Sequence, residues 1–332
     1  MKKILVTGGT GFLAGWVIRR LLEQGCSVRT TVRSEQKFSK IVDMLQAAHV
    51  DTSKLSYVVT DLTAPNGWDQ AMKDVTYVLH LASPLGGNNQ DDPHLINVAK
   101  EGVTYVIEAA IKAQVDKIVM TSSEAANYPE KSNGNQKLNE SYWTDLNNKL
   151  LTNYMRSKVV AEQTAWELIN KQTHTKLVTI LPGAILGPNM SGRHGSTDQI
   201  FEMILKGMPS PHVIYPVVDV RDLADLHIKA MQNSEADGKR FIAESEEMTM
   251  PQMASLIKQH YPSYKVSTLT IPNWFVGIAA NFNSAMKTLN TMIGLKYHRD
   301  NSRARTILKW HPRPASQTVL DSVNYLIQNQ LI

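Results

Sequence analysis

The sequence predicts a doubly wound α/β fold, in which helices cover both faces of a mostly parallel sheet. Two observations carry this prediction. Short β-branched runs alternate with longer segments of helical periodicity through the first half of the chain, and a glycine-rich turn follows the first of these runs. With 332 residues, the chain can form one large domain or two small ones.

The expected elements alternate in chain order. Apolar, β-branched runs predict buried strands at residues 2–6, 27–32, 55–59, 76–81, 117–121 and 177–181. Apolar residues at helical spacing predict helices at residues 12–22, 38–48, 96–113 and 154–169. Because helices separate the strands, we expect the strands to pair in parallel.

The glycine-rich turn has the spacing expected of a dinucleotide-binding loop. Gly8 permits a tight turn, Gly11 lets the backbone approach a pyrophosphate, and Ala14 allows close packing of helix on strand. The N-terminus of the following helix offers free N–H groups and a positive dipole end to the phosphates. This order of strand, loop and helix predicts a Rossmann-type dinucleotide site.

The pattern loosens after Gly183. Glycine, proline and histidine interrupt residues 187–216, PVVDVRDLADLHIKAM then predicts a strand running into a helix, and the apolar run 241–243 is expected to return to the sheet. We therefore expect the dinucleotide-binding domain to contain residues 1–185 and about 217–243. About 186–216 and 244–332 would form a smaller, interleaved C-terminal substrate domain.

Composition excludes several classes of protein. A single cysteine, Cys26, rules out an intrachain disulfide and fits a reducing, cytoplasmic location. The apolar run at the N-terminus is too short for a signal peptide, and no stretch approaches the roughly 18 apolar residues of a membrane span. No histidine and cysteine cluster has metal-ligand spacing. The net charge of +5 is dispersed, so we expect no nucleic-acid partner.

The end of the second predicted strand indicates which dinucleotide binds. An NAD site carries an acidic residue there for the ribose 2′-hydroxyl, whereas an NADP site carries a cation for the 2′-phosphate. Arg33 stands at the strand end with Lys37 four residues on, and the only nearby acid, Glu35, falls in the loop. The alternative is that both cations are solvated surface charges. The pattern favours NADP, used as NADPH.

Tyr154 and Lys158 form a Tyr-x-x-x-Lys pair on one face of a predicted helix. A lysine ammonium held there would favour the phenolate and lower the tyrosine pKa from about 10, so that the phenol could protonate a carbonyl oxygen. Tyr261 and Lys265 repeat the spacing, but Pro262 makes a helix there unfavourable.

Six motifs in order, TGGTGFLAG, VTDL, LHLASP, TSS, YMRSK and LPGAILGP, resemble those of the extended short-chain dehydrogenase/reductases. The resemblance spans nearly the whole chain. Arg33 with Lys37, LASP, DVRDLADLHIKAM and WHPRPASQTVLDSV are most similar to the branch that contains dihydroflavonol reductase, cinnamoyl-CoA reductase and the yeast methylglyoxal/aldehyde reductases.

The resemblance implies a role for individual residues. Ser123 would hydrogen-bond the substrate carbonyl, with Ser122 as the competing candidate, and Tyr154 would donate the proton. Lys158 would hold the nicotinamide ribose and lower the tyrosine pKa. Cofactor contacts are expected from Gly8, Thr10, Gly11, Phe12, Leu13, Arg33, Lys37, Asp61, Leu62, Leu81, Ala82, Ser83, Tyr154, Lys158, Pro182, Gly183 and Ile185.

The expected substrate pocket is mostly apolar or aromatic, with walls from Pro84, Leu85, Tyr128, Ile185 and Met190. These features predict an NADPH-dependent carbonyl reductase that converts a small aldehyde or ketone to an alcohol, as a monomer or homodimer. Two alternatives are an NAD-dependent nucleotide-sugar epimerase or dehydratase, and a non-catalytic NADP-sensing protein. The missing acid counts against the first, and the intact serine, tyrosine and lysine set counts against the second.

Three features leave alternatives open. Glu124 follows the serines where relatives carry a small or apolar residue, so it either adds an acid to the site or points away from it. His80 could relay protons or could be a structural residue at a strand end. Residues 84–93, PLGGNNQDDP, could close over the cofactor as a lid or form a surface loop.

Overall fold

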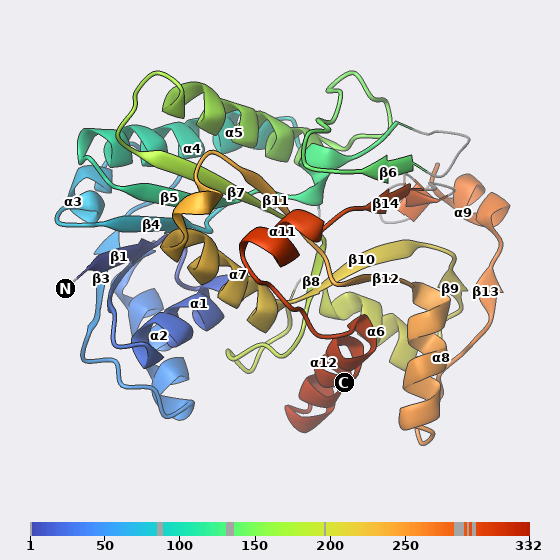
Figure 1. The fold of residues 1–332 in the computed structure, drawn as a ribbon. Helices are drawn as coiled ribbons and strands as arrows, with labels where there is room; N and C mark the ends of the chain where they lie inside the picture. Colours follow the sequence, from blue (N-terminus) through green and yellow to red (C-terminus); the bar gives the residue numbers. More distant parts are fainter. Residues whose placement is uncertain are drawn as a thin grey trace.

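The computed structural model describes residues 2–84, 89–130, 136–195, 197–281, 289–290, 292–293 and 297–332. A seven-stranded sheet in the order β11-β7-β5-β4-β1-β2-β3 forms its centre (Figure 1). Its strands are β1 (Lys3–Val6), β2 (Ser27–Val32), β3 (Leu55–Val59), β4 (Tyr77–His80), β5 (Lys117–Thr121), β7 (Lys176–Pro182) and β11 (Arg240–Ala243). Every pair is parallel, and the strand order reverses between β1 and β4.

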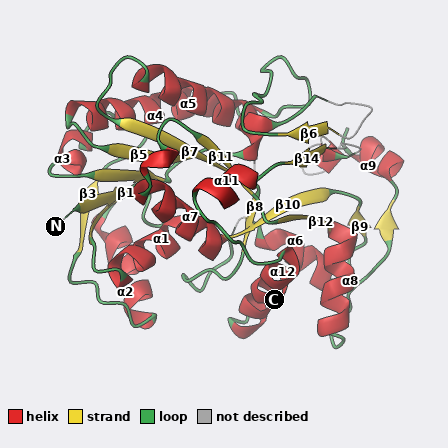
Figure 2. Ribbon diagram, in the orientation of Figure 1, coloured by secondary structure: helices red, strands yellow, loops and turns green. Residues whose placement is uncertain are grey.

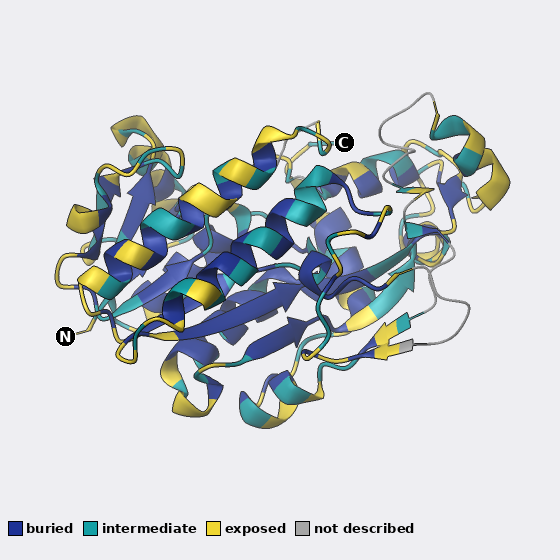
Figure 3. Ribbon diagram, turned by 90° about the horizontal axis from the view of Figure 1, so that it is seen from above, coloured by how far each residue is buried: buried dark blue, intermediate teal, exposed yellow. Residues whose placement is uncertain are grey.

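Helices cover both faces of this sheet (Figure 2). One face packs against α3 (Trp68–Met72), α4 (His94–Lys112) and α5 (Asn153–Ile169), and the other against α1 (Phe12–Glu23), α2 (Glu35–Ala47) and α7 (Val220–Gln232). Figure 3 shows the outer stripes of α4 and α5 exposed, with buried strands beneath them. The predicted doubly wound, Rossmann-type fold is confirmed.

A smaller unit is built on a second sheet. Its three strands are β8 (Ala184–Leu186), β10 (Ile214–Asp219) and β12 (Glu246–Thr249), in the order β12-β10-β8. A separate apolar core joins this sheet to α6 (Asp198–Leu205), α8 (Met250–His260) and α12 (Ala315–Gln328). Two short parallel pairs complete the unit, β9 (Ser210–Pro211) with β13 (Thr270–Ile271) and β6 (Gln136–Leu138) with β14 (Tyr297–Arg299). Four further short helices whose bounds lie within the described part of the chain are η1 (Glu124–Asn127), η2 (Ser234–Ala236), α9 (Asn273–Ala279) and α11 (Ser302–Ile307).

The predicted domain limits lie close to the points where the chain passes from one sheet to the other. Not every limit coincides with such a point. The run 241–243 returns to the central sheet as β11, as expected. The strand expected within PVVDVRDLADLHIKAM does form, as β10, but it pairs with β8 and β12 rather than with the central sheet. The chain therefore leaves the central sheet at Pro182, slightly before the expected limit at 185.

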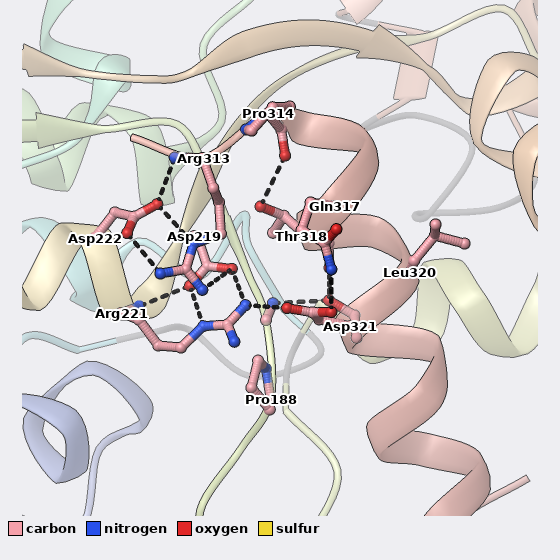
Figure 4. A network of polar contacts seen from close by, with 12 residues as sticks. Pro188, Asp219, Arg221, Asp222, Arg313, Pro314, Gln317, Thr318, Leu320 and Asp321 are labelled. Atoms are coloured by element: carbon pink, nitrogen blue, oxygen red, sulfur yellow. Dashed lines mark hydrogen bonds and ion pairs between the residues drawn. The ribbon is translucent and has the colours of Figure 1, made fainter. Parts of the chain in front are cut away.

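Two sequence motifs that lie far apart meet in a partly buried polar network (Figure 4). Asp219 is fully buried and accepts hydrogen bonds from the backbone and guanidinium of Arg221 at 2.8 Å. Arg313, from WHPRPASQTVLDSV, pairs with Asp222 at 2.8 Å, and Asp321 on α12 pairs with Arg221. These ion pairs hold α12, and the HPRP segment before it, against the start of α7. The motifs DVRD and HPRP therefore have a structural role.

Candidate active site

The phosphate loop has the conformation that its glycines predict. Gly8 has a φ of +70°, and a Cβ there would lie 3.0 Å from the Cβ of Ala82. Gly9 has less room, because its Cβ would come within 2.2 Å of Thr30 Oγ1. Gly11 begins α1 without a side-chain cap, and the first turn carries no acid. The missing Cβ atoms allow this tight turn against β2 and the end of β4, and the first-turn N–H groups of α1 fit a dinucleotide pyrophosphate.

The two predicted 2′-phosphate ligands are exposed and near each other in sequence. Arg33 follows β2 directly, and Lys37 lies in the first turn of α2. Within the described part of the chain, no ion pair or hydrogen bond engages either side chain. Glu35, the only nearby acid, instead accepts a hydrogen bond from the Tyr57 hydroxyl at 3.1 Å. This arrangement leaves both cations available for a phosphate.

Asp61 and Leu62, the predicted adenine neighbours, follow β3. The Asp61 carboxylate accepts hydrogen bonds from the backbone and hydroxyl of Thr63, at 2.9 and 2.8 Å. These bonds, with a smaller contribution from Arg33, lower the Asp61 pKa. Leu62 packs against the core under α4. Both residues therefore occupy fixed positions beside the second strand.

The Thr7 hydroxyl forms hydrogen bonds with three consecutive residues at the end of β4. Its hydroxyl oxygen accepts the N–H groups of Leu81 and Ala82, both at 3.0 Å, so its own proton goes to His80 Nδ1 at 2.9 Å. The buried His80 ring is therefore the neutral tautomer that carries its proton on Nε2. Burial, and then the Lys158 charge, lower its pKa to about 4. This placement favours the structural interpretation of His80.

Tyr154 and Lys158 lie on one face of α5, as predicted. Thr152 caps this helix by accepting the Met155 N–H at 3.2 Å. The Lys158 ammonium donates to Ser83 Oγ at 2.7 Å and lies 5.4 Å from the centre of the Tyr154 ring. The helix thus brings the tyrosine and lysine to the edge of the sheet where β4 ends.

The Tyr154 pKa is raised, whereas the sequence predicts that it is lowered. Burial, and then the charge of Glu124, raise the Tyr154 pKa to about 12, and burial lowers the Lys158 pKa to about 8. The predicted lowering of the tyrosine pKa is therefore not found, because burial of the phenol outweighs the effect of the Lys158 charge. Lys158 is itself desolvated and bonded to Ser83, so its charge does not offset the burial of the phenol.

The two candidate serines have different surroundings. Ser122 is 3% exposed, and its hydroxyl donates to Glu162 Oε2 at 2.7 Å. Ser123 is half-buried and caps η1 by accepting the Ala125 N–H at 3.1 Å. Its hydroxyl proton has no acceptor among the described residues. This contrast favours Ser123 over Ser122 as the residue that contacts substrate.

Glu162 and Arg240 form a buried framework that the sequence analysis missed. The Arg240 guanidinium pairs with Glu162 at 2.9 Å and donates to the carbonyls of Glu140, Tyr142 and Ala126 at 2.8, 2.8 and 3.0 Å. These contacts join α5, β11 and η1, the turn that begins after Ser123. Because the two residues are 78 positions apart in the sequence, no local pattern predicts their pairing.

A second buried histidine supports the end of β5. His227 on α7 donates from Nδ1 to the Leu223 carbonyl and accepts at Nε2 from Thr121, both at 2.8 Å. Burial is the main cause that lowers its pKa to about 4. His227 therefore joins α7 to the strand that leads into the two serines.

Acid should destabilise the fold through these two histidines. Each has a folded pKa of about 4, below the ordinary 6.5, so the unfolded chain binds protons first. Stability is then fully present above pH 6.5 and falls as pH drops towards 4, by up to about 3 kcal/mol for each histidine. Urea unfolding at pH 7 and pH 4.5 measures the loss. His227→Gln should reduce it and exposed His260→Gln should not; equal losses in both variants would contradict the assignment.

The structure brings only some predicted pocket residues to the site. Pro84 lines a small hollow with Ser83 and Lys158, whereas Leu85 lies outside the described residues. Tyr128 is buried at the end of η1, edge-on to Tyr297 with ring centres 6.2 Å apart.

The remaining two pocket residues lie towards the second domain. Ile185 is on β8, paired with Val218 of β10. Met190 lines a separate groove with Trp16 and Met44, between α1, α2 and α12. This placement argues against Met190 as a wall of the substrate pocket.

The predicted lid can be followed only at its ends, because residues 85–88 lie outside the described part of the chain. Its far end contacts the start of α5, where Tyr154 N–H donates to the Gln90 carbonyl at 2.8 Å. Asn153 donates to the Asp91 carbonyl at 2.7 Å. Residues 89–93 therefore lie beside Tyr154, and the lid stays a prediction.

Comparison with known proteins identifies the family. The model of the NAD dependent epimerase/dehydratase family matches residues 4–243. The chain belongs to this family. Dihydroflavonol 4-reductase of Gerbera hybrida is 30% identical over 316 residues, which cover 90% of this chain and 83% of that one.

Solved structures of family-like reductases share the fold. Gre2 of Candida albicans in complex with NADPH has a TM-score of 0.84 at 25% identity, covering 99% of each chain. The yeast methylglyoxal/isovaleraldehyde reductase Gre2 complexed with NADPH has a TM-score of 0.83 at 23% identity, covering 99% of this chain and 100% of that one. The predicted resemblance to extended short-chain dehydrogenase/reductases is confirmed.

The described residues contain neither a metal-binding cluster nor a membrane-spanning helix. They contain no group of three or more histidine, cysteine, aspartate or glutamate side chains arranged to hold a metal ion. Nor does any helix among them have the length and apolar character needed to cross a membrane.

Proposed function

We propose that this family member is an NADPH-dependent carbonyl reductase that reduces an aldehyde or ketone to an alcohol. The observation that carries the proposal is the placement of Tyr154 and Lys158 on one face of α5, with Lys158 bonded to Ser83 at 2.7 Å. Ser83 follows β4, next to the phosphate loop after β1. The proton donor therefore lies at the edge of the sheet where a dinucleotide would bind.

The cofactor is assigned from the residues at the end of β2. Exposed Arg33 can present a planar fork to a 2′-phosphate, and Lys37 offers a point charge. Arg33 stands at the strand end where an NAD site would carry an acid, and Glu35, the only acid nearby in sequence, accepts a hydrogen bond from Tyr57. These contacts support NADP over NAD, and they count against an epimerase that retains NAD.

Each catalytic residue has a defined task in this proposal. Ser123 and Tyr154 hold the substrate carbonyl oxygen, and Lys158 holds the nicotinamide ribose. NADPH held by these residues would supply the hydride for the carbonyl carbon. Tyr154 donates its phenolic proton to the oxygen, and the balanced products are the alcohol and NADP⁺. A raised pKa keeps Tyr154 protonated at neutral pH, as a proton donor must be.

A screen of carbonyl compounds tests the function. Aldehydes, aryl ketones and aliphatic diketones would be incubated with NADPH, and loss of NADPH absorbance would be compared with alcohol formed. We expect equal amounts of alcohol and NADP⁺ for at least one compound. The proposal fails if no carbonyl oxidises NADPH while a nucleotide-sugar is turned over without net cofactor consumption.

The proposal also includes a cytoplasmic location and a monomeric or homodimeric state for the protein.

A further inference from the structure

Glu124, the acid that follows Ser123, has a partner from a distant segment. The Arg299 guanidinium on β14 lies 2.8 Å from Glu124 Oε2, measured from Nη1. Its Nη2 donates to the Asn127 carbonyl at 3.4 Å. The Arg299 side chain is only 1% exposed. Arg299 therefore contacts both ends of η1, the turn that begins after Ser123.

Two carboxyl groups, those of Glu124 and Glu244, lie close to this one guanidinium, and the Glu247 carboxyl lies near both of them. Glu244, directly after β11, lies 3.7 Å from Arg299 Nη1, and Glu247 is bonded to His298 at 3.0 Å. Burial raises the Glu244 pKa to about 8, so that carboxyl keeps its proton at neutral pH. Burial also raises the Glu124 pKa, and the Arg299 charge is the main cause that opposes this rise, so Arg299 is the cation that favours the ionised form of Glu124.

The charge balance between Glu124 and Arg299 matters because the Glu124 charge affects the Tyr154 pKa. Its charge is the second cause, after burial, that raises the Tyr154 pKa. The charged groups that face Tyr154 among the described residues are Glu124 from η1 and Lys158 from α5. Without the Arg299 charge the Glu124 pKa would rise further, and Glu124, once ionised, would oppose formation of the phenolate more strongly.

We propose that Arg299 is a positioning residue that holds the Ser123 turn against the second domain and neutralises Glu124 beside Tyr154. This inference rests on the proposed function, because it concerns the proton donor of that reaction. It also resolves the open question of Glu124, whose carboxylate is turned towards a cation rather than left free in the pocket.

The test measures alcohol oxidation by NADP⁺ over a pH range, using the alcohol product of the best carbonyl substrate. This direction needs the Tyr154 phenolate, so kcat/KM rises with pH and levels off near the apparent pKa of that group. We call the rising part of this profile the limb. Arg299→Met leaves Glu124 uncompensated, and we expect the limb to move to higher pH. On the limb, each unit of movement lowers kcat/KM about tenfold. Glu124→Gln should move the limb to lower pH.

A double variant separates electrostatics from simple loss of structure. In Glu124→Gln/Arg299→Met both charges of the pair are gone, so the limb should return close to the wild-type position. Lys137→Met is the matched control, because it removes an exposed ion pair with Asp300 at 3.0 Å on the same β6–β14 pair. Lys137 is 73% exposed, and its loss should not move the limb.

The outcomes are distinct. A folded Arg299→Met variant with the wild-type limb, or a double variant with the limb of Arg299→Met, overturns the inference. If Arg299→Met does not fold, Glu124→Gln alone decides, since an unmoved limb there also overturns it. If the wild-type protein neither reduces carbonyls nor oxidises alcohols, the proposed function itself fails.

Discussion

Tyr154→Phe should bind NADPH nearly as well as the wild-type protein and lose most turnover. The phenyl ring keeps the packing of α5 but has no proton for the carbonyl oxygen. General acid–base assistance contributes about 10²- to 10⁴-fold in rate, so we expect a fall in kcat of that size. The measurement pairs steady-state rates on the best carbonyl substrate with a fluorescence titration of NADPH.

Tyr261→Phe is the control for this prediction. Tyr261 belongs to the second Tyr-x-x-x-Lys match, and its ring lies edge-on to Tyr264 far along the chain, after α8. Its loss should leave kcat unchanged. A tenfold or smaller drop for Tyr154→Phe would reject Tyr154 as the proton donor.

Replacing Arg33 and Lys37 together by alanine should weaken NADPH and leave NADH unaffected. NADH has no 2′-phosphate, so it loses nothing when the two cations are removed. A hydrogen bond to a charged group contributes about 1.5 to 3 kcal/mol, which is roughly ten- to hundredfold in affinity for each contact. The Kd of each cofactor, measured by titration, gives the ratio directly.

Lys40→Ala provides a matched control, because Lys40 is also exposed on α2 but lines the groove with Trp16. It should weaken neither cofactor. Equal losses of NADPH and NADH in the Arg33 and Lys37 variant, or a wild-type preference for NADH, would reject the assignment of the 2′-phosphate site.

The features that the sequence predicts well are local. A β-branched run marks each central strand because both faces of a parallel sheet are buried, and glycine spacing marks the turn into α1 for steric reasons. Tyr154 and Lys158 share a face because they are four residues apart on a helix. Each of these signals lies within one or two consecutive elements.

Other features depend on contacts between distant segments. The pairing of β14 with β6 brings Arg299 to Glu124, and no repeated pattern in either short strand announces it. The raised pKa of Tyr154 also depends on the whole fold, because it follows from burial and from the Glu124 charge. Spacing along a helix predicts that two side chains meet, but not the solvation of either one.

The fate of deuterium carried at the nicotinamide C4 of NADPH tests hydride transfer most directly. The enzyme would reduce the best carbonyl substrate with each C4-deuterated form of NADPH, and mass spectrometry would locate the label. The account predicts that one of the two forms delivers one deuterium to the carbinol carbon for each NADP⁺ formed. Substrate turnover with the label still in reduced cofactor, or an alcohol without deuterium from either form, would contradict it.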